Sequence, residues 1–250
     1  MKVKYVSATF SVKFPRCETI RRSINDLEDQ LNEYYNIPQN LGIPDNVEPR
    51  LPRLTFRSKQ GHSNINFSQI SGDLNVNYDH AFQVDLNKSF KYLQSRSMLI
   101  LDALNYIDIH EFYYSGVSIL INVEFDEKDG DPIEFLINRY KTLDHKDNLF
   151  DFEVKYAKVE NEKFYINERI SNYRTYVVDN LGTGIVPIGK YEVAEKGVAI
   201  NIDINSRAKF NKDGISVNDT VIKTDLQEIN RLLNIEIGAF NKEYMNMKEG

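Results

Sequence analysis

The segment from Leu51 to His80 restricts the fold of this chain more than any other. Apolar and polar residues alternate through three short runs, which are separated by the sequences Gln60-Gly61-His62 and Ser71-Gly72-Asp73. Alternation with a period of two is typical of a strand with one buried face, and such glycine-containing sequences form the turns between antiparallel neighbours. The segment therefore predicts a three-stranded meander. Its predicted inward side chains are Leu54, Phe56, Ile65, Phe67, Leu74, Val76 and Tyr78.

The periodicity of the remaining chain predicts further strands and helices. Alternation covers residues 2–14, 113–125, 149–159, 163–178 and 198–206, and apolar residues at helical spacing cover 17–34, 86–104, 133–140 and 226–244. Residues 36–50 and 180–197 are predicted to be loops. Asp131 with Pro132 is a typical start of a helix, and Thr224 with Gln227 forms a capping box for the last helix.

Each half of the chain contains the order strand, helix, three strands, long helix. Strands in runs, without regular alternation with helices, favour an α+β fold with antiparallel sheet and helices packed mainly on one side. We expect two similar lobes, residues 1–110 and 111–250, which form two domains or join edge to edge into one continuous domain. A duplication is a hypothesis that different strand orders in the two halves would contradict.

Composition restricts the functional classes. The chain has 250 residues, a net charge of −6 and a single cysteine, Cys17. The negative charge disfavours a protein that holds nucleic acid by its phosphate backbone, and one cysteine excludes an intrachain disulfide. No apolar run approaches the roughly 18 residues of a membrane span, and the alternating N-terminal segment differs from a signal peptide. We expect a cytoplasmic protein with no membrane contact.

One pattern of residues resembles a metal-dependent nuclease site. Asp131 precedes a strand that carries Glu153-Val154-Lys155, and such enzymes use carboxylates to hold Mg²⁺ and a lysine to position water. The motif is short and recurs by chance. Asp131 also fits a simple role as a helix cap, and Glu153 and Lys155 fit an ordinary solvated pair. A Mg²⁺-dependent nuclease is therefore the alternative interpretation.

The acidic turn before the third predicted helix offers oxygen ligands. Asp126, Asp129 and Asp131 could bind Ca²⁺ or Mg²⁺, but the turn lacks the ligand order of an EF-hand. A solvated connection is the simpler interpretation. The four histidines are scattered, without the spacing of a zinc site, so we predict no cofactor.

Tyrosine and arginine alternate along one predicted strand. Tyrosine rings could stack on bases or line a pocket, with arginine placed to meet phosphate. The alternative is that tyrosine packs well in strands, and the net charge disfavours nucleic acid. The candidate binding residues are Tyr165, Arg169, Tyr173, Arg174 and Tyr176.

Three segments carry a resemblance to a known family. PRLTFRSKQGHSNINFSQISGDLNVNYD, SFKYLQSRSMLILDAL and AINIDINSRAKF, the last before a terminal amphipathic helix, resemble an uncharacterised prokaryotic family that is scattered among genomes and associated with mobile or defence genes. The N-terminal strand departs from that family because it lacks the usual proline-rich opening. The resemblance implies a non-enzymatic or unknown role and assigns no site residues.

We therefore expect a non-enzymatic binding protein. Its partner is expected to be another protein. The chain is expected to form a homodimer or to act as an accessory factor in a mobile-element or phage-defence context. No catalytic set converges in the sequence, tyrosine is abundant, and two long helices carry wide apolar stripes. Two alternatives stay open: the nuclease, and a binder of nucleic acid or a small ligand that uses the exposed sheet face and residues 180–197.

Overall fold

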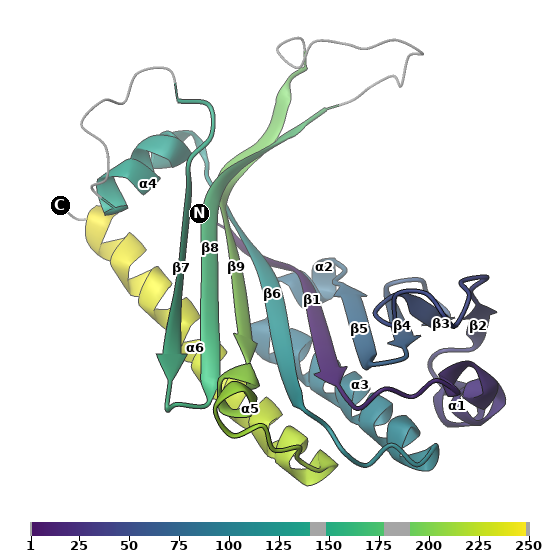
Figure 1. Ribbon diagram of the computed structural model, residues 1–250. Coiled ribbons are helices and arrows are strands. Elements are labelled where there is room, and N and C mark those ends of the chain that lie inside the picture. The colour runs from purple at the N-terminus through teal and green to yellow at the C-terminus, as the bar shows by residue number, and fades with distance from the viewer. Residues whose placement is uncertain (1, 141–148, 178–190, 249–250) are drawn as a thin grey trace.

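The computed structural model describes residues 2–140, 149–177 and 191–248, with side chains as far as residue 240 (Figure 1). The strands are β1 (Lys2–Lys13), β2 (Ile37–Asn40), β3 (Pro52–Arg57), β4 (Ser63–Ser68), β5 (Ser71–Asn77), β6 (Tyr114–Glu124), β7 (Glu153–Glu160), β8 (Phe164–Tyr176) and β9 (Val193–Asn205). The helices are η1 (Ile20–Ser23), α1 (Ile24–Leu31), α2 (His80–Gln83), α3 (Leu86–Tyr106), η2 (Glu127–Asp129), α4 (Pro132–Tyr140), α5 (Arg207–Asp213) and α6 (Asp219–Lys248).

All of these strands belong to one antiparallel sheet. Its order is β2-β3-β4-β5-β1-β6-β9-β8-β7, and the two halves of the chain meet where β1 pairs with β6, from Lys2 opposite Glu124 to Lys13 opposite Tyr114. In each half the first strand lies at the centre, the last strand lies beside it, and the earlier strands follow outward. Apart from β2, which has no counterpart among the described strands of the C-terminal half, the halves thus have the same strand order. The duplication and the proposed domain boundaries stay predictions.

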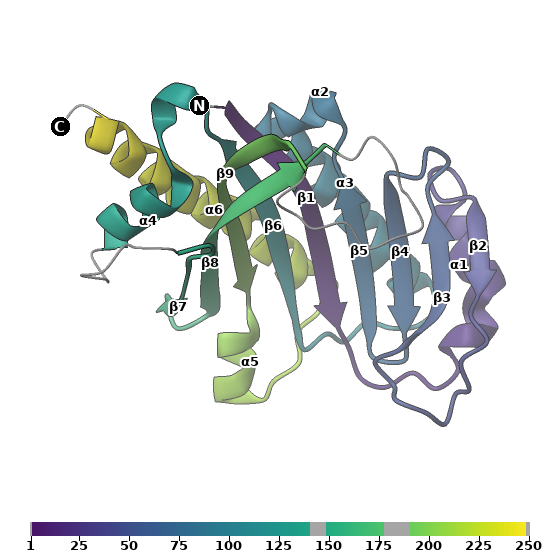
Figure 2. The same cartoon turned by 90° about the horizontal axis from the view of Figure 1, so that it is seen from above.

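The helices cover one face of this sheet, and the predicted α+β class is confirmed. Figures 1 and 2 show α3 behind the N-terminal half of the sheet and α6 behind the C-terminal half. The strands present alternate residues to these helices: Phe10 and Val12 of β1 and Ile119 and Ile121 of β6 are buried. One continuous apolar core extends through both halves, because the sheet between them is unbroken.

The predicted meander is confirmed as β3, β4 and β5, while the preceding loop prediction is partly wrong. Within residues 36–50 the structure places β2, where Pro38 lies opposite Phe56 of β3. The strand is short and has no apolar period. A proline is tolerated there because its missing N–H can face away from the sheet at an edge strand.

Other boundaries also differ from the sequence prediction. The first helical segment begins at Ile20, α2 and α5 were not predicted, and β9 begins at Val193, inside the segment expected to be a loop. The last helix begins at Asp219, before the predicted cap at Thr224. Asp131 does cap α4, because its Oδ1 accepts a hydrogen bond from the backbone N–H of Ile133 at 2.8 Å. No described helix is long and apolar enough to cross a membrane.

Candidate functional site

The sheet face opposite α3 and α6 carries polar side chains. Along β6, residues that point to the helices are buried, whereas Ser118 and Asn122, which point the other way, are partly exposed. The same alternation holds along β1 and β5. We call this surface the open sheet face. Its central residues are Thr9, Ser11, Asn64, Asn66, Asn75, Asn77, Ser118, Asn122 and Asn201.

Hydrogen bonds between neighbouring strands order these side chains. The Asn75 Nδ2 donates to Asn64 Oδ1 at 3.0 Å, and the Ser118 Oγ donates to Asn201 Oδ1 at 2.9 Å. An amide has two N–H donors and an oxygen that can accept twice, so one such bond leaves further donors and acceptors for a ligand. The open sheet face is therefore rich in hydrogen-bonding groups, and its charged members include Asp73, opposite Ser11, and Asp203, opposite Ser118.

A hollow of about 530 Å³ lies at one end of the open sheet face. A smaller hollow of about 200 Å³ shares Tyr114 and Arg207 with it and extends over Thr9 and Ser118 of the open sheet face. The larger space therefore borders the open sheet face. We call it the cationic hollow, after the residues that line it: Lys13, Arg16, Arg50 and Arg207, together with Tyr113 and Tyr114.

Segments distant in sequence supply these cations. Lys13 is the last residue of β1, Arg16 follows it in the chain, and Arg207 is the first residue of α5. Arg50 belongs to the connection between β2 and β3. Both halves of the chain thus contribute to the cationic hollow. Four cationic side chains meet there in a protein whose net charge is −6.

Among the described residues, Asp73 is the single carboxylate that lines the cationic hollow. Its Oδ1 accepts a hydrogen bond from Ser11 Oγ and lies 3.2 Å from Lys13 Nζ, and its Oδ2 accepts from Ser71 Oγ at 2.7 Å. These contacts occupy both oxygens. Asp73 therefore neutralises Lys13 and leaves the three arginines without a carboxylate inside the hollow.

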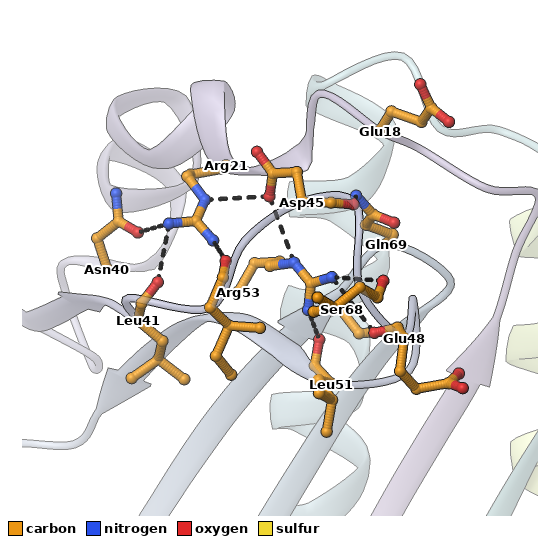
Figure 3. A network of polar contacts seen from close by, with 12 residues as sticks. Glu18, Arg21, Asn40, Leu41, Asp45, Glu48, Leu51, Arg53, Ser68 and Gln69 are labelled. Atoms are coloured by element: carbon orange, nitrogen blue, oxygen red, sulfur yellow. Dashed lines mark hydrogen bonds and ion pairs between the residues drawn. The ribbon is translucent and has the colours of Figure 1, made fainter.

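A buried arginine fixes the connection that carries Arg50. Arg53 is fully buried, and its guanidinium donates to the backbone oxygens of Leu51 at 2.7 Å and of Val47 and Glu48, each at 3.3 Å (Figure 3). Its Nε also lies 3.3 Å from Asp45 Oδ1. Residues 45–51 therefore wrap around one guanidinium. We call these contacts the Arg53 clamp.

Arg21 holds the start of the same connection. It donates to Asn40 Oδ1 at 2.9 Å, to the Leu41 oxygen at 2.8 Å and to the Ile43 oxygen, and its Nε lies 3.3 Å from Asp45 Oδ1. Figure 3 shows Asp45 between the two guanidinium groups. These hydrogen bonds and ion pairs hold the connection from β2 to β3 in place along most of its length.

Gln69 joins Arg16 to this connection. It is buried, its Nε2 donates to the backbone oxygen of Asp45 at 2.9 Å, and its Oε1 accepts from Arg16 Nε at 3.1 Å. Its backbone N–H donates to the Pro49 oxygen at 3.1 Å. One glutamine thus positions Arg16 directly and Arg50 through the adjacent Pro49.

An aromatic group holds the opposite wall of the cationic hollow. The ring of Phe210 in α5 packs against Tyr113 and Tyr114, with centroids 4.9 and 6.0 Å apart. The guanidinium carbon of Arg207 lies 5.7 Å from the ring centroid of Tyr114. No carboxylate of the described residues lies within ion-pair distance of Arg207. This arginine is therefore held by ring contact and available to an anion.

The five binding residues predicted on β8 lie on both faces of the strand. Tyr165, Arg169 and Tyr173 point to the open side of the sheet, whereas Arg174 and Tyr176 point to the other side. Arg169 forms an ion pair with Glu153 at 2.6 Å, and Tyr173 donates a hydrogen bond to Glu195. Arg174 donates to the backbone oxygen of Phe150 at 3.1 Å. The five residues do not converge on one pocket, and their binding role stays a prediction.

The residues of the nuclease alternative occupy separate places. Glu153 and Lys155 lie on β7, where Glu153 pairs with Arg169. Asp131 caps α4 and lines a hollow of about 370 Å³ that neither of them borders. Asp126 caps η2 by accepting from the Lys128 N–H at 2.8 Å, and Asp129 accepts from the Asp126 N–H at 2.9 Å.

No described group of three His, Cys, Asp or Glu residues could hold a metal ion. The nuclease alternative and the acidic-turn metal site both stay predictions. Of the predicted loop 180–197, residues 180–190 lie outside the described part of the chain, and residues 193–197 form the start of β9.

Buried acids lie on the helix side of the C-terminal half. Glu168 is buried and accepts a hydrogen bond from Tyr156 Oη at 2.6 Å. Its burial raises the pKa of the Glu168 carboxyl, an effect that the Tyr156 hydrogen bond opposes and the neighbouring Glu236 reinforces. Asp225 is also buried, and its pKa is raised by burial although Lys163 pairs with it.

The sequence did not indicate the cationic hollow. Its cationic residues are spread along the sequence from Lys13 to Arg207, and none of them belongs to a motif. The one available signal was Arg53 in an alternating strand, at a position that points away from the predicted core. Comparison with known protein families and with curated proteins finds no match to this chain.

Proposed function

We propose that this chain is a non-enzymatic binding protein that receives another protein on the open sheet face. One observation carries the proposal: within the described residues, the helices α1, α3, α4 and α6 gather on one face of the sheet, while the opposite face keeps exposed polar side chains in its central strands. An antiparallel sheet can be covered by helices on one face and leave the other face to solvent or to a partner.

The chemistry of the open sheet face favours a protein over nucleic acid. Its central strands carry amide and hydroxyl groups such as Asn75 and Ser118, together with the carboxylates of Asp73 and Asp203, whereas affinity for a phosphate backbone comes from rows of Lys and Arg. The expected partner therefore presents a surface with hydrogen-bonding groups. The proposal includes a cytoplasmic location, which rests on the sequence pattern of the N-terminal segment and the lack of a long apolar run. It also includes an accessory role in a mobile-element or phage-defence context, which rests on the sequence resemblance.

The test uses bulky charged substitutions at exposed positions of the open sheet face. Thr9 on β1 and Asn77 on β5 are both exposed, so Thr9→Arg and Asn77→Arg leave the core intact. Asn87→Arg, on the exposed side of α3, is the matched control. Tagged wild-type protein and the three variants are used to capture partners from the source cells, and each purified protein is examined by sedimentation.

The proposal expects a protein that wild type and Asn87→Arg retain and that both face variants lose. Identical capture by all four proteins, or no specific capture by wild type, would contradict it. A wild-type dimer that the face variants dissociate would assign the open sheet face to a second copy of the chain, and this would overturn the separate partner.

A further inference from the structure

We propose that the cationic hollow binds a small molecule that carries phosphoryl groups. This site is separate from the proposed docking of a protein and does not depend on it. Arg16, Arg50 and Arg207 reach the cationic hollow from three different segments. Their guanidinium groups can therefore donate to one ligand from several sides, as a tetrahedral group with several terminal oxygens requires.

The charge of the lining fits a phosphoryl ligand better than a carboxylate. Asp73 already pairs with Lys13, which leaves three arginines in the lining. A carboxylate offers one negative charge and two oxygens, whereas a phosphate monoester carries roughly −1.5 to −2 near neutral pH and three acceptor oxygens. Arginine is the side chain best suited to paired hydrogen bonds with phosphate oxygens.

The arginines are also available. Arg207 has no ion-pair partner among the described residues. Arg50 is 83% exposed, and its Nε lies 3.9 Å from Glu48. Arg16 uses Nε for Gln69 and lies 3.4 Å from Glu18 with one Nη, which leaves the other Nη for a ligand. A phosphoryl group would therefore gain contacts without breaking a buried pair.

Two features make the cationic hollow a formed site. The Arg53 clamp (Figure 3) and Gln69 fix the segment that carries Arg50, and Gln69 also holds Arg16. Tyr113 and Tyr114 are held by Phe210 on the opposite wall. The volume of about 530 Å³ lies within the range of roughly 300–1,000 Å³ that small-molecule sites occupy. There is room for an organic group beside the phosphoryl oxygens.

The experiment titrates pyrophosphate into the purified chain by calorimetry, with citrate as a carboxylate of comparable charge. The variants are Arg207→Gln and Arg50→Gln, both at exposed positions. Arg22→Gln is the matched control, because Arg22 is exposed on η1 and does not line the cationic hollow. Thermal unfolding of each variant confirms that it is folded.

We expect one pyrophosphate per chain, bound more tightly than citrate and more weakly as salt is raised. Arg207→Gln and Arg50→Gln should each weaken binding about tenfold, because each loses a charge-assisted hydrogen bond, and Arg22→Gln should bind as wild type does. Equal affinity for citrate, no binding at low salt, or an equal loss in Arg22→Gln would overturn the assignment. None of these outcomes bears on the protein partner, because no partner is present in the measurement.

Discussion

Apart from β2, the two halves of the sheet share a strand order, but one half buries a basic side chain and the other buries acidic ones. In the N-terminal half the buried group is Arg53, whose guanidinium is surrounded by backbone oxygens of residues 47–51. In the C-terminal half the buried groups are the carboxyls of Glu168 and Asp225, which face the helix side of the molecule. The same topology therefore accommodates a buried cation at one end and buried acids under a helix.

This difference shows how each half uses a buried ionisable group. Arginine stays charged at every pH at which a protein folds, so the Arg53 clamp is a permanent support for the rim of the cationic hollow. A buried carboxyl can take up a proton instead, so the C-terminal half has a stability that depends on pH. We expect the N-terminal half to determine site geometry and the C-terminal half to determine the response to acid and base.

The largest predicted effect comes from Arg53→Met. Methionine keeps much of the apolar stem but leaves the backbone oxygens of Leu51, Val47 and Glu48 without their donor. We expect the free energy of unfolding to fall by about 3 kcal/mol, because buried acceptors lose their hydrogen bonds. Urea unfolding followed by circular dichroism measures this change. Pyrophosphate binding should weaken as well, since Arg50 loses its support.

Arg57→Met is the matched control for this prediction. Arg57 lies on the same strand as Arg53 but is exposed, and its replacement should change the free energy of unfolding by less than about 0.5 kcal/mol. If the two variants lose the same stability, the Arg53 clamp does not support the N-terminal half in the way described.

The next effect has the opposite sign and belongs to the C-terminal half. Burial raises the pKa of Glu168 above its ordinary value of 4.5, so the folded chain keeps a proton at pH values at which the unfolded chain has lost it. The stability linked to this group is therefore complete below the unfolded pKa and is lost as pH rises through the folded pKa. Glu168→Gln is neutral at every pH. We expect it to match wild type near pH 4 and to exceed it at pH 8 by on the order of 1 kcal/mol.

Chemical unfolding at a series of pH values gives the two curves to compare. Glu33→Gln, at an exposed position just beyond α1 in the N-terminal half, should run parallel to wild type throughout. A Glu168→Gln curve that also runs parallel to wild type would show that the pKa of this carboxyl is the same in the folded and unfolded chains. The proposed contrast between the halves would then be wrong.

The elements with strong local patterns could be predicted from the sequence. The meander, β1, β6, α3 and α4 follow from apolar periodicity, because one face of each is buried against the core. The strand β2 could not be predicted, since four residues with a proline have no period and pair only because Leu54 and Phe56 of β3 are already placed. Short edge strands depend on their neighbours more than on their own residues.

The cationic hollow lay beyond sequence reasoning for a related reason. The four cationic residues approach one another only because β1 pairs with β6 and the backbone N–H of Gln69 donates to the backbone oxygen of Pro49. These residues are Lys13, Arg16, Arg50 and Arg207. Such long-range pairing has no local signal. The candidate residues chosen on β8 and β7 shared an element, and adjacent residues of a strand point to opposite faces. Alternation therefore separated Tyr173 from Arg174.

The smallest predicted effect compares the long helices of the two halves. The side chain of Asp85 accepts a hydrogen bond from the Lys88 N–H at 3.0 Å at the start of α3, and the side chain of Asn218 accepts from the Val221 N–H at 3.1 Å at the start of α6. The two caps are equivalent in position. Asp85→Ala and Asn218→Ala should therefore each lower the free energy of unfolding by about 1 kcal/mol.

Thr224→Ala tests where α6 begins, because the sequence pattern of Thr224 and Gln227 predicts the helix cap at Thr224. In the structure Thr224 lies inside α6, where its Oγ1 donates to the Thr220 oxygen at 3.0 Å, and Ile222 before it is fully buried. The apolar stripe therefore begins upstream of Thr224 and extends the helix past the local capping signal. Alanine is the better helix former, so Thr224→Ala should cost less than about 0.5 kcal/mol. Urea unfolding that finds Thr224→Ala more damaging than Asn218→Ala would place the start of α6 where the sequence pattern put it.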